Sequence, residues 1–506
     1  MVKKTLNIDL NRVEGDLEFE LDIEDGIVVD ARCIGVMYRG FEQIMIGRMP
    51  RDAAVITPRV CGICGTAHLY AATLALEQIW GIRPPPNATY IRNLCLLTES
   101  IQNDIRQSFL MFLVDFCHQA YRDHPLYNHI MAGFEPFKGR HHLGALEQSR
   151  DAVGIIALFG GQWPHSSYML PGGVVSKPTH RKLIEATNII TGLTRWYENA
   201  VIGDSLENWL DLNSRDAFFN WMEKDQKRAD SALGIFTRFS RDIGLHEIGF
   251  GSENLISYGV MSDSLNGGEY AMPPGVYDAG NKTISPLDQS LITEHVRYSW
   301  FRQYPGGRHP FKGETIPDYQ TESDRYTWAK APRYDGKVMQ TGPLAELVIG
   351  ADPLITDFHQ REGASTWLRQ FSRLRRIGHS LVQMKQLVKT LSADIDGEFF
   401  LPPKPEDEVD GKGFGMIQAA RGGLGHWVSV KDGVVESYQI ITPTAWNASP
   451  RDADGNHGHW EQSVIGLKVD DLENPLTISH VIRSHDPCLV CTVHMLPTGK
   501  SVRFGL

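Results

Sequence analysis

The chain has 506 residues, of which 42% are hydrophobic and 22% charged, as in an ordinary globular protein. Its formal net charge is −11, and its sequence has no basic stripe that could neutralise phosphates. A nucleic-acid partner is therefore disfavoured. No apolar run reaches the roughly 20 residues needed to cross a bilayer, and the N-terminus has no signal-peptide core. We therefore expect a cytoplasmic protein, in which partners supply any association with a membrane.

The first part of the chain changes from a strand pattern to a helical pattern. Alternating apolar residues predict strands over 5–36, with a hairpin turn at Asp25-Gly26. A helical pattern over 67–80 stops at Gly81, and a long one follows over 88–121. Further helices are predicted over 144–159, 178–212, 214–241 and 362–394. The last two segments are rich in Lys and Arg, which a solvated face explains without a ligand.

The second half contains less regular patterns. Residues 245–350 are dense in Gly, Pro, Tyr and Asp, a composition typical of functional walls or lids. An acidic run over 402–408 predicts a surface loop, and 427–440 predicts a second hairpin. We expect an α+β fold that is predominantly helical, with a large helical-bundle core and small antiparallel sheets near both termini. Length alone suggests about three domains, but the motifs described next lie near opposite ends and favour one cooperative unit.

Two Cys-x-x-Cys pairs, Cys61/Cys64 and Cys488/Cys491, are the most informative feature. Four thiolates on two short loops can close around one soft metal if the fold brings them together. The simpler alternative is a structural zinc site made of all four thiolates. Such sites usually stabilise small modules, whereas more than 400 residues separate these pairs and can build their own core. This size favours a metal site with chemistry.

Three further cysteines, Cys33, Cys95 and Cys117, are isolated in the sequence. Their simplest interpretation is as small buried apolar residues. Three are too few to hold a separate iron–sulfur cluster by four thiolates.

The residues around the cysteine pairs form longer motifs. Arg59 precedes the first pair and His68 follows it, while Asp486-Pro487 precedes the second pair and His494 follows it. Other motifs occur at Arg12-Val13-Glu14-Gly15, 38–42, 50–53, 164–165, 171–174, 330–334, 421–427 and 443–447. In this order they resemble the motifs of the large subunit of nickel–iron hydrogenases, and the resemblance covers most of the chain. The segment 488–494 is most similar to the cytosolic uptake enzymes.

The resemblance implies a nickel–iron centre whose iron carries one carbonyl and two cyanides. In that family the residues matching Cys61 and Cys488 bind nickel terminally, and those matching Cys64 and Cys491 bridge nickel and iron. The implied reaction is the heterolytic oxidation of H2 to two protons and two electrons. A metal-bound thiolate, which we assign to Cys488, is a usable base because the cation lowers its pKa.

Other catalytic roles also come from the resemblance. Glu14 matches the first proton relay, and Arg421 matches an arginine held over the open coordination position, with Asp486 as its partner. The simpler alternatives are an exposed strand carboxylate and a salt-bridged loop arginine. Two positions depart from the family pattern: Ala420 stands where a proline is frequent, and Asn103, next to Asp104, where many relatives have an aspartate.

A second, hard cation is implied near the C-terminus. Glu42, the backbone carbonyl of Ile440, and His494 match the ligands of a site that usually holds Mg²⁺, a cation suited to oxygen ligands and water. His68 is expected to donate a hydrogen bond near the first metal site. Residues 495–506 are similar to a tail that a maturation endopeptidase removes after nickel-insertion factors have acted, which leaves 1–494 as a single domain.

The cysteine count also implies a partner. Because this chain cannot hold a separate cluster, electrons must leave through an iron–sulfur small subunit. We expect it to dock near Cys61 and the N-terminal loop through a large apolar interface. Two alternatives remain at this point: a quinone-reductase subunit of the respiratory complex I type, which lacks the four cysteines, and a non-catalytic protein with a structural zinc site.

Overall fold

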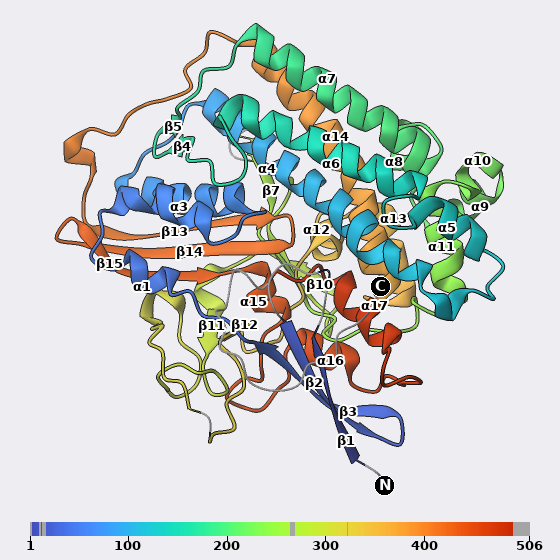
Figure 1. Ribbon diagram of the computed structural model, residues 1–506. Helices are drawn as coiled ribbons and strands as arrows, with labels where there is room; N and C mark the ends of the chain where they lie inside the picture. Colours follow the sequence, from blue (N-terminus) through green and yellow to red (C-terminus); the bar gives the residue numbers. More distant parts are fainter. Residues whose placement is uncertain (1–2, 10–11, 13–16, 264–268, 321, 489–506) are drawn as a thin grey trace.

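The computed structural model describes residues 3–9, 12, 17–263, 269–320 and 322–488. Long helices gather in one half of the molecule, and small antiparallel sheets occupy the other half (Figure 1). The described part therefore has the predicted α+β architecture, with a helical bundle and small sheets near both ends of the chain.

Four long helices form the bundle: α4 (Pro86–Arg106), α6 (Arg140–Gly160), α7 (His180–Trp196) and α14 (Thr366–Ala393). Helix α4 lies between α6 and α14, and α7 packs on α6 and α14. Shorter helices surround them: α5 (Tyr127–Phe134), α8 (Leu206–Leu210), α9 (Arg215–Glu223), α10 (Gln226–Ala229), α11 (Ala232–Asp242), α12 (Pro343–Ile349) and α13 (Pro353–Glu362). Stacked buried aromatic rings, such as Trp367 and Phe371, fill the space between them.

One three-stranded sheet consists of β13 (Gly411–Ala419), β14 (Gly422–Lys431) and β15 (Val434–Ile441), paired antiparallel in that order. Helix α3 (Gly65–Trp80) lies across β13 (Figure 1). A second antiparallel sheet, β1 (Lys3–Asp9), β2 (Leu17–Glu24) and β3 (Ile27–Gly35), packs its apolar face against α16 (His459–Val464) and α17 (Leu476–Ser484). The N-terminal strands therefore pack against helices from the C-terminal part of the chain.

The remaining short elements connect these layers. They are α1 (Phe41–Met45), α2 (Ala53–Ile56), β4 (Met169–Leu170), β5 (Gly173–Val174), β6 (Leu255–Ser257), β7 (Val260–Asp263), β8 (Glu269–Met272), β9 (Gly275–Asp278), β10 (Thr283–Ser285), β11 (Ile292–His295), β12 (Ala331–Tyr334) and α15 (Pro443–Asn447). The segment predicted to be irregular over 245–350 thus contains several short strands and α12. The two predicted hairpins, at Asp25-Gly26 and 427–440, are confirmed.

Three predicted helices are shorter or divided in the structure. The pattern over 88–121 continues beyond α4 as a π-helix (Gln107–Phe112) and a 3₁₀-helix (Leu113–Cys117), because an apolar face does not specify the hydrogen-bond pattern. The segment 178–212 divides at Gly203, and 214–241 divides into α9, α10 and α11. Each of these three helices begins at a side chain that caps its N-terminus: Ser214, Asp225 and Ser231.

The solvated-face interpretation of 362–394 is wrong for four arginines of α14. Arg369, Arg373, Arg375 and Arg376 are buried and bind carboxylates, side-chain oxygens or backbone carbonyls. The sequence alone does not distinguish a solvent-exposed arginine from one that is buried with a carboxylate partner, because that partner lies elsewhere in the chain.

Candidate metal centre

Cysteines from the two ends of the chain meet in the core. The sulfur atoms of Cys61, Cys64 and Cys488 all lie within 4.8 Å of one another, and the three residues are buried and free of disulfides. The Cys61 Sγ–Cys488 Sγ distance of 3.4 Å is far longer than a disulfide bond. The fourth predicted ligand, Cys491, lies outside the described residues. The structure thus places three of the four predicted cysteines around one point.

Local elements hold each cysteine loop in place. Cys61 follows a 3₁₀ turn, and the Arg39 guanidinium donates to the carbonyls of Arg59 and Val60 at 2.6 and 2.9 Å. Cys64 immediately precedes α3. On the other loop, the Cys488 backbone N–H donates to Thr444 Oγ1 at 3.3 Å, which connects it to α15.

Arg421 lies beside the cysteines and is held by Asp486, as predicted from the sequence. Its Nε donates to the Asp486 backbone carbonyl at 3.1 Å and lies 3.2 Å from the Asp486 Oδ1 atom. Asn103 donates its side-chain amide to the other oxygen of Asp486 at 2.6 Å. The neighbouring Asp104 instead binds Arg376.

The free end of Arg421 helps to line a small pocket together with Cys64, Cys488, Thr442 and Thr444. Its Nη1 atom is buried and has no hydrogen-bond partner within the described part of the chain. Burial lowers the pKa of Arg421, but Asp486 and the three cysteine sulfurs raise it well above its ordinary value. The side chain is therefore a fixed cation whose unpaired donor is available to a group in this pocket.

His68 also lines this pocket and begins a buried chain of hydrogen-bonded rings. His68 Nδ1 is 3.0 Å from His426 Nε2, and His426 Nδ1 is 2.8 Å from the Tyr438 hydroxyl. Burial lowers the pKa of His68 to about 4, so the imidazole is neutral. The sequence predicted His68 but not its two partners. His426 lies within the motif 421–427, which was the signal available for it.

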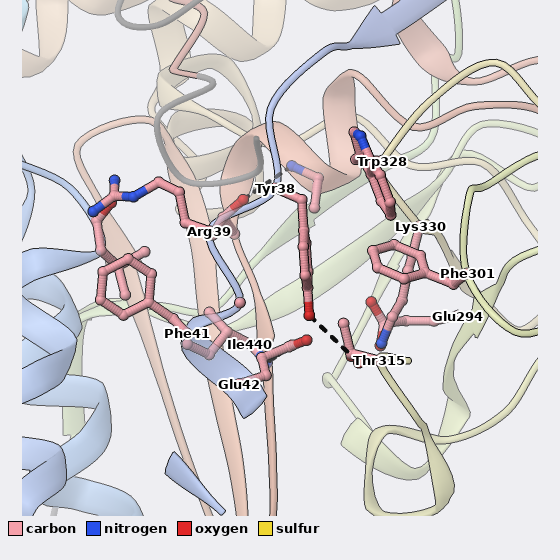
Figure 2. Close-up of a pocket in the computed structure, with 14 residues that line it drawn as sticks. Tyr38, Arg39, Phe41, Glu42, Glu294, Phe301, Thr315, Trp328, Lys330 and Ile440 are labelled. Atoms are coloured by element: carbon pink, nitrogen blue, oxygen red, sulfur yellow. Dashed lines mark hydrogen bonds and ion pairs between the residues drawn. The ribbon is translucent and has the colours of Figure 1, made fainter. Parts of the chain in front are cut away.

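Two of the three predicted hard-cation residues, Glu42 and Ile440, line a second pocket (Figure 2). Glu42 Oε1 accepts a hydrogen bond from the Ile440 backbone N–H at 2.7 Å, so these two residues are brought together. His494 lies outside the described residues. The same pocket contains Glu294 and Lys330, whose charged groups are 3.4 Å apart. Burial raises the pKa of Glu294 to about 7 although Lys330 lowers it.

Glu294 was missed because it lies in the Gly- and Pro-rich segment, where no motif marks it. Lys330 begins the motif 330–334, but this motif alone indicates no role for its lysine.

The predicted relay Glu14 lies outside the described residues, but Arg12, two positions earlier, is described. Arg12 forms an ion pair with Asp115, whose other oxygen accepts from Arg483 of α17 at 2.5 Å. One buried carboxylate therefore connects the N-terminal motif to the helix that leads to Cys488.

Among the described helices, none combines the length and the apolar character that a membrane crossing requires.

Comparisons with known proteins agree with this geometry. Residues 39–118 and 229–494 match the family described as nickel-dependent hydrogenase. The chain is 31% identical to the periplasmic NiFeSe hydrogenase large subunit of Desulfomicrobium baculatum, over 98% of this chain and 95% of that protein. It is 26% identical to the uptake hydrogenase large subunit of Rhodobacter capsulatus, over 96% of this chain and 94% of that protein. Its fold matches a reduced Ni-Fe-Se hydrogenase from D. vulgaris Hildenborough with a TM-score of 0.82 and 30% identity, over 97% of this chain and 100% of that one.

Proposed function

Because the chain belongs to the nickel-dependent hydrogenases, as a large subunit, we propose that it is the catalytic subunit of an uptake hydrogenase of the cytosolic type. Its reaction would be the oxidation of H2 to two protons and two electrons. The observation that carries this proposal is the convergence of three buried cysteine sulfurs within 4.8 Å from opposite ends of the chain. Family membership argues against the zinc-scaffold alternative, and the cysteines argue against the complex I alternative.

The donor set fits a nickel–iron centre. Thiolates are soft ligands suited to nickel and iron, and burial keeps water from them. In the proposal Cys61, Cys64, Cys488 and Cys491 would hold a nickel–iron centre whose iron would carry one carbonyl and two cyanides. When bound, this centre supplies the site at which H2 is split heterolytically.

In the proposal, residues of this chain stabilise charge and accept protons. The Cys488 thiolate accepts a proton, since metal coordination keeps it deprotonated near neutral pH. Arg421 directs an unpaired N–H donor and a fixed positive charge toward the pocket, and Asp486 keeps its guanidinium in that orientation. Glu14 is proposed as the next proton acceptor.

Replacing Glu14 by Gln tests the proton relay. The Glu14→Gln variant should retain its metals and block net H2 oxidation, because an amide cannot carry the proton away. Metal analysis and H2-dependent dye reduction measure the two effects. H2 oxidation at the normal rate would exclude Glu14 as the relay.

The pocket in Figure 2 is proposed to hold Mg²⁺. Glu42, the Ile440 carbonyl and His494 would provide oxygen and imidazole ligands, with water completing the shell. Support comes from the contact between Glu42 and Ile440 and from the polar side chains around them.

We also propose the partners and the processing. An iron–sulfur small subunit would dock on the face next to Cys61, where Ile44, Ile46, Met49 and Val55 are exposed.

Residues 495–506 would be removed by a maturation endopeptidase after nickel-insertion factors act, which leaves 1–494 as one domain. The mature complex is proposed to be cytoplasmic.

Metal analysis and infrared spectroscopy of the co-purified complex test the function. We expect about one nickel and at least one iron per chain, together with absorption bands of metal-bound carbonyl and cyanide. An active preparation without these bands, or one that contains zinc alone, would refute the proposal.

A further inference from the structure

Glu99 is a buried carboxylate for which the proposed reaction has no use. It lies on α4, is 1% exposed, and is not part of any of the motifs described above. Both of its oxygens are occupied by backbone donors at the start of α3: Oε2 accepts from Thr66 N at 2.9 Å, and Oε1 accepts from Ala67 N at 3.1 Å. It therefore contacts the helix that begins directly after Cys64.

These two donors would otherwise lack partners. The first backbone N–H groups of a helix have no intrahelical acceptor, and the residue before the helix usually supplies one from its side chain. Here that residue is Cys64, which makes no capping hydrogen bond with its side chain. Glu99 provides this cap from another helix, while the Cys64 sulfur lies within 4.8 Å of the Cys61 and Cys488 sulfurs.

The neighbouring turn of α4 contacts the other parts of the metal site. Asn103, four residues after Glu99, binds Asp486, two residues before Cys488. Asp104 binds Arg376, which in turn donates to the Ala420 carbonyl at 2.5 Å, directly before Arg421. Helix α4 thus contacts the start of α3 and Asp486 directly and, through Arg376, the turn that carries Arg421.

We propose that Glu99 is a positioning residue that fixes the first cysteine loop relative to the second, with α4 as the common support. Both oxygens of a carboxyl group can accept N–H bonds, whereas the NH₂ of an amide would face a backbone N–H and repel it. The role rests on the proposed nickel–iron centre, but it concerns only the placement of this chain's own ligands.

The test compares Glu99→Gln with Glu77→Gln in the complete complex with its small subunit. Glu77 is a matched control, because it is also buried, also connects α3 to α4 through Arg92 at 2.8 Å, and lies at the opposite end of α3 from Cys64. The readouts are nickel per chain, the infrared bands of the iron ligands, kcat and the midpoint of thermal unfolding. The wild-type complex must first show these bands; their absence there would refute the proposed function, not the role of Glu99.

For Glu99→Gln we expect shifted or split infrared bands and a kcat about ten- to a hundredfold lower, since small displacements of reacting groups reduce rates strongly. Glu77→Gln should leave the band positions unchanged even if it unfolds at a lower temperature. If Glu99→Gln does not assemble, Glu99→Asp, which keeps two acceptor oxygens on a shorter side chain, should show the same displacement of the bands. Unshifted bands in the variant that assembles, or an equal shift in Glu77→Gln, would overturn the proposal.

Discussion

The Arg421–Asp486 pair is a buried ion pair beside the three clustered cysteines. Both side chains are buried, and the carboxylate is shared with Asn103. Removing one member of a buried ion pair leaves an uncompensated charge, which costs far more than the pair contributes. The sequence departure at Asn103 is explained here, since its amide donates a hydrogen bond to the Asp486 carboxylate.

The Arg421→Lys variant should keep the positive charge of the side chain and lose its planar guanidinium group. We expect kcat to fall about a hundredfold with nickel content unchanged, because the ammonium cannot bind Asp486 and direct a donor into the pocket at once. Arg375→Lys on α14 is the control, as this arginine binds Asp352 at 3.0 Å and lies in the bundle. A kcat equal to that of the wild type would show that the guanidinium geometry is dispensable.

Asp30 on β3 provides a residue-level test of pH dependence. Burial raises its pKa, but hydrogen bonds from Arg451 and His457 and the charges of Arg451 and Arg32 bring it down to about 2. Since the pKa of the folded state is the lower one, the stabilisation is complete above the unfolded pKa of about 4 and is lost as the pH falls through about 2.

We expect Asp30→Asn to lower the free energy of unfolding at pH 7 by about 1 kcal/mol, after allowing for solvent screening of this partly exposed group. The difference between wild type and variant should disappear between about pH 4 and pH 2. Denaturant titrations at several pH values measure it. A difference that stays constant down to pH 2 would contradict the assignment.

At the scale of elements, the contact between α3 and β13 sets the position of the first cysteine loop. Gly415 faces the α3 backbone so closely that a Cβ there would overlap the Ala71 carbonyl oxygen. The same strand leads through the turn at Ala420 to Arg421 and β14. The helix–sheet contact therefore joins the two sides of the pocket, and a glycine is required for close approach.

Gly415→Ala should destabilise the protein by about 2–3 kcal/mol, because α3 must move away from the sheet. Gly192→Ala on α7 is the matched control. A Cβ at Gly192 has no neighbour within 4 Å, so this change should stabilise the helix by up to about 1 kcal/mol. Thermal unfolding of both variants measures the effects, and equal midpoints would show that the contact is looser than described.

At the scale of the whole molecule, the metal site requires nearly the complete chain. Cys61 and Cys488 belong to the same buried core as the helical bundle, so neither loop is positioned until that core has formed. Ile44, Ile46, Met49 and Val55, on the face proposed for the small subunit, expose their apolar side chains. Association with a partner would complete this burial.

Met49→Glu combined with Val55→Glu tests that face. Both side chains are about half exposed, at 58% and 49%, so the change should leave the fold intact and weaken binding of the small subunit about tenfold or more. Ile184→Glu on α7, 61% exposed, is the control. Titration of the isolated subunits measures their affinity. Equal affinities of the two variants would show that the small subunit binds elsewhere on the surface.

Motifs and periodicity were sufficient to predict the fold class, several elements and part of the candidate site. The α+β class, the hairpin at Asp25-Gly26, α3 with its end at Gly81, and the contact between Arg421 and Asp486 are confirmed. The first three depend on local patterns, namely strand alternation, helical periodicity and a left-handed glycine. The contact between Arg421 and Asp486 was expected from the family resemblance. The roles of Glu14, Cys491 and His494 stay predictions, since these residues lie outside the described part.

Only the tertiary structure decided the features that join residues far apart in the chain. The buried arginines of α14, the ring chain from His68 to Tyr438, and the cap that Glu99 provides to α3 all depend on partners from other elements. A sequence states which groups are available, but burial and pairing depend on the path of the whole backbone. The candidate metal ligands were therefore predicted from the sequence, while the packing of α4 against α3 and α14, which supports Cys61, Cys64 and Cys488, is seen only in the structure.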